Sequence, residues 1–108
     1  MTFLGEFEQV VLLAILRAGD EAYGVTISRE IARCTGRDPA PGALYTTLDR
    51  LEGKGLVTSR YGDPTATRGG RAKRYFAVSE EGVRAVAQAQ RGFQRLLKGL
   101  SLPGLARA

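Results

Sequence analysis

Two segments of the chain decide its fold: PGALYTTLDRLEGKGLV at residues 41–57 and RGGRAKRYF at residues 68–76. The first predicts a helix from Pro41 to about Glu52, because proline suits the first turn of a helix and leucines follow on one helical face. The inward residues are Leu44, Leu48 and Leu51. The outward residues are Gly42, Thr46, Asp49 and Arg50, with Tyr45 on the flank.

A β-hairpin is predicted after this helix. Residues 56–61 and 72–78 are rich in β-branched and aromatic residues and alternate in polarity, as short strands do. The polar loop between them, residues 62–71, is longer than a tight turn requires. Long loops in compact domains are usually functional or disordered.

Two helices are predicted before residue 41, over 4–18 and 23–35, and two prolines within residues 37–41 make the next segment a turn. The first helix is apolar nearly all round from Val10 to Leu16, so it is buried on more than one side. In so small a chain a second copy is one way to cover that side. The second helix carries an apolar stripe of Val25, Ile27, Ile31 and Cys34.

The last helix is predicted from Ser79, a good N-cap, to about Leu100. Its apolar positions step alternately by three and four residues, which is the spacing of a heptad seam with one polar interruption. The seam consists of Val83, Val86, Gln90, Phe93, Leu97 and Leu100. Three glycines weaken this helix, and packing against a partner would offset the loss.

The order helix, helix, helix, strand, strand, helix predicts an α+β fold, mainly α, of the winged helix-turn-helix class. The DNA-binding domain is assigned to residues 1–78, a C-terminal dimerisation helix to residues 79–100 and a tail to residues 101–108. In this arrangement the third helix is the reader of the DNA major groove.

Composition excludes several classes of function. The chain has 108 residues, a net charge of +5, no His and one Cys. It therefore cannot form a His-based catalytic triad, a Cys/His zinc site or an internal disulfide, and a reducing cytoplasm is the expected compartment. No secretory signal is visible, and the apolar run at residues 10–16 is too short to span a bilayer. We expect no metal and no cofactor.

Positive charge is concentrated in the predicted hairpin. Residues 56–79 hold five basic and one acidic side chain, whereas residues 1–55 hold six basic and eight acidic ones. A basic block in the middle of a chain suggests a structured contact surface, and double-stranded DNA is the partner that fits it.

Three motifs, in order, resemble the PadR family of bacterial transcriptional regulators: AYG at residues 22–24 and the two segments quoted above. The likeness covers about residues 4–98. It implies a winged-helix repressor that forms a dimer through its first and last helices, binds a two-fold symmetric operator and releases DNA when a small molecule or stress signal arrives. The chain length matches the short branch of the family, which has a single C-terminal helix.

Arg50 and Thr46 are the candidates for base-edge contacts, since Arg favours guanine and Thr meets a thymine methyl or a phosphate. Pro41 and Gly42 bring the positive end of the third helix to the DNA backbone. The basic hairpin supplies phosphate or minor-groove contacts, and its glycines permit close approach of the backbone. These hairpin candidates are Arg68, Gly69, Gly70, Arg71, Lys73 and Arg74.

Some assignments have two interpretations. Tyr45 either reaches a phosphate or packs against the hairpin, and Asp49 either accepts from cytosine or pairs with a nearby Arg. Lys73 and Arg74 point to opposite faces if both lie in a strand, so one of them can be structural.

Dimer contacts are predicted for Phe7, Val11 and the six residues of the heptad seam. Phe7, Phe93 and Leu97 either line an effector pocket between subunits or form simple dimer core. Cys34 is predicted to be a buried, inert thiol, because a redox sensor needs exposure and a lowered pKa.

Two rival functions are weighed. A winged-helix adaptor with a basic wing would bind an acidic protein and would bind DNA only weakly and without sequence preference. An enzyme is disfavoured because His is absent and no carboxylate pair has a clear site.

Overall fold

The computed structural model describes residues 3–63 and 72–104. The elements, in chain order, are α1 (Glu6–Ala18), the 3₁₀ helix η1 (Gly19–Glu21), α2 (Gly24–Thr35), α3 (Pro41–Gly53), β1 (Val57–Tyr61), β2 (Arg74–Val78) and α4 (Glu80–Leu97). Each predicted helix and strand is present, and most ends lie within two residues of the predicted ones. The largest difference is at the end of α4, which stops at Leu97 rather than at about Leu100.

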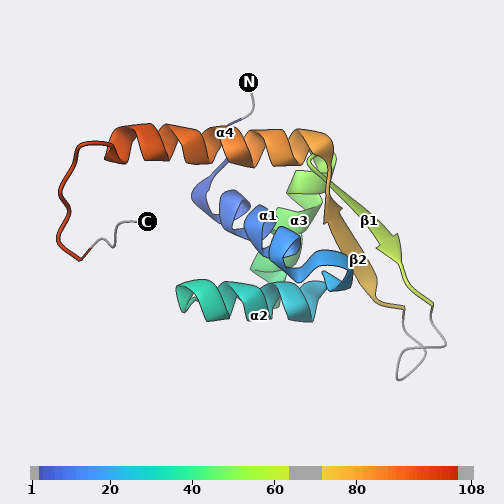
Figure 1. Cartoon of the computed structure of the whole chain (residues 1–108). Coiled ribbons are helices and arrows are strands. Elements are labelled where there is room, and N and C mark those ends of the chain that lie inside the picture. The colour runs from blue at the N-terminus through green and yellow to red at the C-terminus, as the bar shows by residue number, and fades with distance from the viewer. Residues whose placement is uncertain (1–2, 64–71, 105–108) are drawn as a thin grey trace.

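Helix α1 is the centre of the core. It packs against α2, α3, β2 and α4 and lies between α4 and α2 in Figure 1. Val11, Leu12 and Ile15 are at most 2% exposed, because the nearly all-apolar run of this helix faces several neighbours at once. The sequence suggested that a second copy of the chain could cover the other apolar side of this helix. Part of that side is covered within the chain itself, although Leu13 and Leu16 remain exposed.

Strands β1 and β2 form an antiparallel hairpin that projects from the helices (Figure 1). Val57 pairs with Val78 at the root, and Tyr61 pairs with Arg74 at the far end. The pairing continues one step further, where the Gly62 amide donates to the carbonyl of Lys73 over 2.8 Å. We call this hairpin the wing.

A main-chain hydrogen bond joins the wing to the segment before α2. The Phe76 amide donates to the carbonyl of Ala22 over 2.8 Å, and the side chains of both residues are buried. Ala22 is completely inaccessible, so a larger residue has no space there. The next two residues, Tyr23 and Gly24, are thereby held beside the wing.

Helix α4 begins against the root of the wing. The Ser79 hydroxyl accepts from the Gly82 amide over 3.0 Å and donates to the carbonyl of Gly55 over 2.7 Å, so the predicted N-cap is confirmed. The close approach requires glycine at position 82: a Cβ there would lie 2.2 Å from the carbonyl oxygen of Leu56. The glycine that weakens the helix is therefore also the one that lets it pack.

Glu8 is a buried acid that the sequence analysis did not single out. Its carboxylate accepts from Lys54 Nζ and from the Gly5 amide, both over 2.7 Å. Burial raises the pKa of Glu8, but these two donors outweigh burial and hold the pKa below its usual value. The pair ties the start of α1 to the end of α3.

Two predicted core positions on α2 were wrong. Val25 is 55% exposed, and Cys34 is also exposed. Val25 lies about 200° around the helix from Ile27, so it faces away from the buried Ile27 and Ile31. Cys34 shares the side of these two isoleucines but lies near the end of α2. An apolar stripe on a helix marks a face and does not show how much of its length is covered.

The described helices include none that is long and apolar enough to cross a membrane. The radius of gyration is 15.6 Å, whereas a compact chain of this length has about 13 Å. Figure 1 shows the reason, since α4 extends past the ends of the other helices.

We expect Gly82→Ala to lower the free energy of unfolding by about 2–3 kcal/mol, because the added methyl group meets main-chain atoms that cannot move aside. Gly92→Ala is the matched control on the same helix, where a Cβ meets nothing within 4 Å. That change should raise stability by roughly 1 kcal/mol through helix propensity. Urea unfolding of both variants checks the pair, and equal effects at the two positions would contradict the packing argument.

Candidate nucleic-acid interface

Helix α3 presents one face to the core and the other to solvent. Leu44, Thr47, Leu48 and Leu51 are buried. The opposite face, which includes Pro41, Gly42, Thr46 and Arg50, is exposed as the helical spacing predicted. Pro41 starts the helix, and Ala40 before it contributes no side-chain cap, so the amides of the first turn remain open to an outside acceptor.

Tyr45 packs at the flank of α3, which favours the second of its two interpretations. Its ring lies 6.4 Å from that of Phe76 in β2, and its hydroxyl lies against Gly24 at the start of α2. A Cβ at position 24 would approach that hydroxyl to 2.4 Å. Tyr45 thus links α3 to both the wing and α2 while keeping 39% of its surface exposed.

Arg74, which was predicted to contact DNA, forms ion pairs within the chain, and these favour a structural role for its side chain. Its guanidinium contacts Glu52 over 2.6 Å and Asp49 over 3.2 Å, and it lies over the ring of Phe76. Partial burial lowers the pKa of Arg74, but the two carboxylates outweigh it and raise that pKa. The interpretation of Asp49 as the partner of a nearby Arg is confirmed.

Lys73 directly precedes Arg74 in the chain, but its side chain lies on the opposite side of the wing, next to Tyr23. Its ammonium lies 4.4 Å from the centroid of the Tyr23 ring and donates to the Tyr23 hydroxyl over 3.4 Å. Of the two adjacent cations, Arg74 is therefore the structural one.

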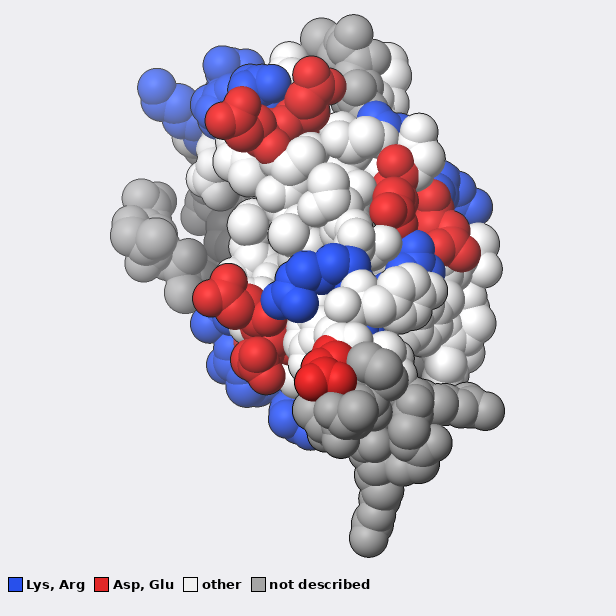
Figure 2. All heavy atoms as spheres, turned by 90° about the vertical axis from the view of Figure 1, so that its right-hand side faces the viewer, with Lys and Arg blue, Asp and Glu red and all other residues white. Residues whose placement is uncertain are grey.

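Arg68, Gly69, Gly70 and Arg71 lie outside the described residues. Figure 2 shows the side of the molecule from which the wing projects. Acidic and basic side chains are interspersed there, so the described part of this face has no continuous basic patch.

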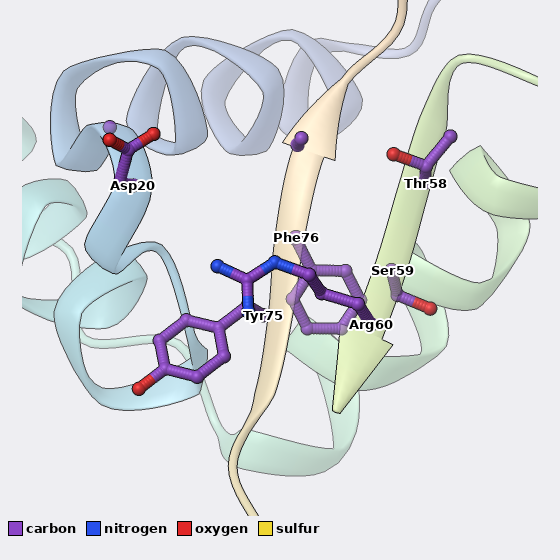
Figure 3. Close-up of a pocket in the computed structure, with 8 residues that line it drawn as sticks. Asp20, Thr58, Ser59, Arg60, Tyr75 and Phe76 are labelled. Atoms are coloured by element: carbon purple, nitrogen blue, oxygen red, sulfur yellow. The ribbon is translucent and has the colours of Figure 1, made fainter. Parts of the chain in front are cut away.

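An aromatic cluster at the wing was not predicted from the sequence. Tyr23 and Tyr75 meet edge to face with centroids 5.6 Å apart, and Arg60 lies 4.7 Å from the centroid of Tyr75. Figure 3 shows Arg60 and Tyr75 on neighbouring strands beside a hollow of about 150 Å³ that Asp20 also lines. Tyr75 directly after Lys73 and Arg74 was the available signal, but its pairing with Tyr23 depends on the Ala22–Phe76 hydrogen bond.

The predicted dimer residues divide into two groups. Val11 and Val86 are at most 3% exposed within the single chain, so assigning them to a partner contact was wrong. Their positions fit the apolar spacing because that spacing also serves the chain's own core. Gln90, the polar interruption of the seam, donates through its amide to the Gln9 side chain of α1 over 3.1 Å.

The remaining predicted dimer residues keep accessible surface. Phe93 is 54% exposed, Leu100 53% and Val83 43%. Phe7 and Leu97 are half-buried. Phe7 packs against the core, and the Arg37 guanidinium lies 5.1 Å from its ring centroid.

This arrangement is that of a winged-helix DNA-binding protein: a helix with an open face, a second helix packed across it and a hairpin beside it. Residues 12–88 match the family described as the transcriptional regulator PadR-like family. The chain is 33% identical over 96 residues to the transcriptional regulator Rv3488 of Mycobacterium tuberculosis, a match that covers 86% of this chain and 85% of the relative. The chain belongs to the PadR-like family, whose members are transcriptional regulators and not enzymes.

Solved structures agree with this assignment. A transcriptional regulator from Clostridium thermocellum superposes with a TM-score of 0.70 at 26% identity, over 84% of this chain and 85% of that one. F93 from STIV, a winged-helix DNA-binding protein, superposes with a TM-score of 0.67 at 13% identity, over 93% of this chain and all of that one. The second likeness supports the fold alone. No group of His, Cys, Asp or Glu among the described residues could hold a metal ion.

We expect Arg74→Met to lower the free energy of unfolding by about 1–2 kcal/mol, because Glu52 and Asp49 then face each other without their shared cation. Combining it with Glu52→Gln should restore part of the loss, and the double-mutant cycle measures that coupling. Arg84→Met is the control, since its 3.7 Å pair with Glu81 is mostly exposed. A strictly additive cycle would show that Arg74 and Glu52 do not stabilise each other.

Proposed function

We propose that this chain is a homodimeric, sequence-specific DNA-binding repressor that a small-molecule or stress signal releases from a two-fold symmetric operator. The observation that carries the proposal is the open face of α3, where Thr46 and Arg50 are exposed on a helix fixed by a fully buried leucine face. Membership of a family of transcriptional regulators supports the same conclusion.

The reading helix makes two kinds of contact in this proposal. Arg50 and Thr46 contact base edges in the major groove, and the first turn at Pro41 and Gly42 contacts the DNA backbone. Asp49 lies on the same helix, but Arg74 offsets its charge, so it repels the phosphates less than a free carboxylate would. Tyr45 contributes a phosphate contact only through the exposed part of its side chain.

The wing holds the flanking DNA backbone through Arg68, Arg71 and Lys73, with Gly69 and Gly70 permitting close approach. Residues 1–78 bind DNA in this proposal, and residues 79–100 join two copies. A two-fold axis between the copies then places the two reading helices on half-sites about 10 base pairs apart, or a multiple of that distance.

Selection from a random duplex pool at about 150 mM salt tests this function, because non-specific phosphate binding is suppressed there. We expect enrichment of an inverted repeat. Arg50→Ala should relax the sequence preference at one position of each half-site, whereas Arg71→Ala should weaken all duplexes alike and reduce the salt slope by about one.

Two outcomes would contradict the proposal. Binding without enrichment that disappears as salt rises would indicate a basic surface only, which is what the adaptor alternative predicts. Loss of affinity in both variants with unchanged preference would show that α3 is not the reader.

A second copy of this chain is the partner that two apolar surfaces favour. One is the far end of α4, where Phe93, Leu96 and Leu100 are all more than half exposed. The other is an open groove of about 400 Å³ between α1 and α2, lined by the apolar Val10, Leu13, Leu16 and Ile31 together with Cys34. Exposed apolar side chains that lie together on a surface are candidates for contact with a partner.

Helix α4 of one copy would fill the groove of the other under two-fold symmetry, which buries both surfaces twice.

An effector pocket near Phe93 is a further part of this proposal. A hollow of about 390 Å³ beside α4 is lined by Phe93 but by neither Phe7 nor Leu97.

We expect Phe93→Asp to convert the dimer to a monomer, as light scattering would report, because a carboxylate cannot be buried against apolar groups without a partner. Val25→Asp is the matched control, since Val25 is 55% exposed against 54% for Phe93 but belongs to neither apolar surface. Cys34 is the one thiol of the chain and lines the groove, so it should react faster with a thiol reagent in the Phe93→Asp variant. A Phe93→Asp protein that stays dimeric would place the interface elsewhere.

A further inference from the structure

Four side chains form a row at the wing in which two cations enclose two aromatic rings. Arg60 lies over Tyr75, Tyr75 meets Tyr23 edge to face, and Lys73 lies over Tyr23. Figure 3 shows the Arg60 end of the row, with the guanidinium between Asp20 and the Tyr75 ring. The row joins both strands of the wing to the residue that precedes α2.

The Lys73 ammonium forms no ion pair with any residue that the structure describes. Arg74 contacts two carboxylates, whereas the contacts of Lys73 within the described part of the chain are with the Tyr23 ring and hydroxyl. Cation–π contact directs an ammonium group without neutralising it. The Lys73 ammonium can therefore also contact an anion from outside the chain.

Tyr23 has a hydrogen to donate. Its oxygen accepts from Lys73 Nζ, so the phenol O–H is free of that bond and can donate to a further acceptor. The ammonium also has two more N–H groups. An anion placed beside the pair can therefore accept from both groups at once.

The pair lies where three DNA-facing elements meet. Tyr23 immediately precedes Gly24, which contacts the Tyr45 hydroxyl on the flank of α3. The Ala22–Phe76 hydrogen bond fixes the Tyr23 main chain to β2, and Lys73 directly precedes that strand. The two groups are thus held at a set position relative to the reading helix.

We propose that Tyr23 and Lys73 together bind a phosphate of the DNA backbone at the junction of α2, α3 and the wing, with the Tyr23 ring positioning the Lys73 ammonium. The inference rests on the proposed function. A phosphodiester oxygen matches the two donors, because it is anionic and accepts from ammonium and phenol groups alike. Neither group reads a base here, so the contact adds affinity without sequence preference.

Three variants test the pair on the operator obtained by selection. Tyr23→Phe keeps the ring and removes the hydroxyl, and Lys73→Met removes the charge and keeps the chain length. Arg60→Met removes the cation at the other end of the row and serves as the matched control. Thermal unfolding of each variant identifies any loss of folded protein.

We expect Lys73→Met to weaken operator binding about tenfold and to reduce the salt slope by about 0.9. Tyr23→Phe should weaken it about threefold with an unchanged unfolding midpoint, and Arg60→Met should leave it within about twofold. The double variant Tyr23→Phe/Lys73→Met should bind about as Lys73→Met alone does, because the two donors serve one phosphate.

Operator duplexes that each carry one neutral methylphosphonate supply the second readout. One position should weaken the wild-type protein and leave the Lys73→Met variant unaffected. A purely structural role for the row predicts no such position and equal losses for Arg60→Met and Lys73→Met, which would overturn the inference. Wild-type binding by Tyr23→Phe would also overturn it.

The same measurements separate this inference from the proposed function. If the wild-type protein enriches an operator and Arg50→Ala changes its preference while the Tyr23 and Lys73 variants bind normally, only the phosphate site fails. If the wild-type protein enriches nothing, the proposed function fails, and the phosphate site with it.

Discussion

The hydrogen bond from the Phe76 amide to the Ala22 carbonyl holds the DNA-facing half of the molecule together. A two-stranded hairpin is marginally stable by itself, and this bond adds the segment before α2 along its edge. The side chains around it follow from that contact. Phe76 turns inward toward Tyr45 on one side of the wing, and Tyr75 turns toward Tyr23 on the other. Together with the contacts of Tyr45 and the ion pairs of Arg74, this bond sets the orientation of α2, α3 and the wing relative to one another.

The electrostatics of the interface depend on which side of the wing a cation occupies. Arg74 is on the side of α3, where it meets two acids, and Lys73 is on the side of α2, where it meets an aromatic ring. The first reduces the negative charge of the reading helix, and the second forms no ion pair with any described residue. Two adjacent residues of the same charge therefore have different electrostatic roles, and the net charge of the chain does not distinguish them.

The order of elements and the open face of α3 could be predicted from the sequence, because both depend on local periodicity and on prolines and glycines at element ends. The buried face of α3 is an example, since the spacing of its leucines places all of them on one side of the helix, which must then face the core. Partners that are distant in the chain could not be predicted in the same way. The Glu8–Lys54 pair spans 46 residues and the Lys73–Tyr23 contact spans 50, and no local pattern encodes either.

The burial of individual side chains could not be predicted reliably from the sequence either. Val11 and Val86 fit an apolar seam that served equally well for a partner or for the chain's own core, and only the packing decides between them. Cys34 shows the reverse case, since its place on an apolar stripe predicted burial and its position at the end of α2 leaves it exposed. Periodicity identifies a face, and the length of the neighbouring element decides how much of that face is covered.

The contact at Gly82 has a mechanical consequence. Because the helix backbone there touches the Leu56 carbonyl and the Val78 side chain, the root of α4 has no slack against the two strands. If α4 tilted as a rigid body about this contact, a tilt of about 10° would move Leu97 by about 4 Å, given the rise of about 1.5 Å per residue. A displacement of several ångströms at the far end of α4 would therefore correspond to a small rotation of the helix against the wing.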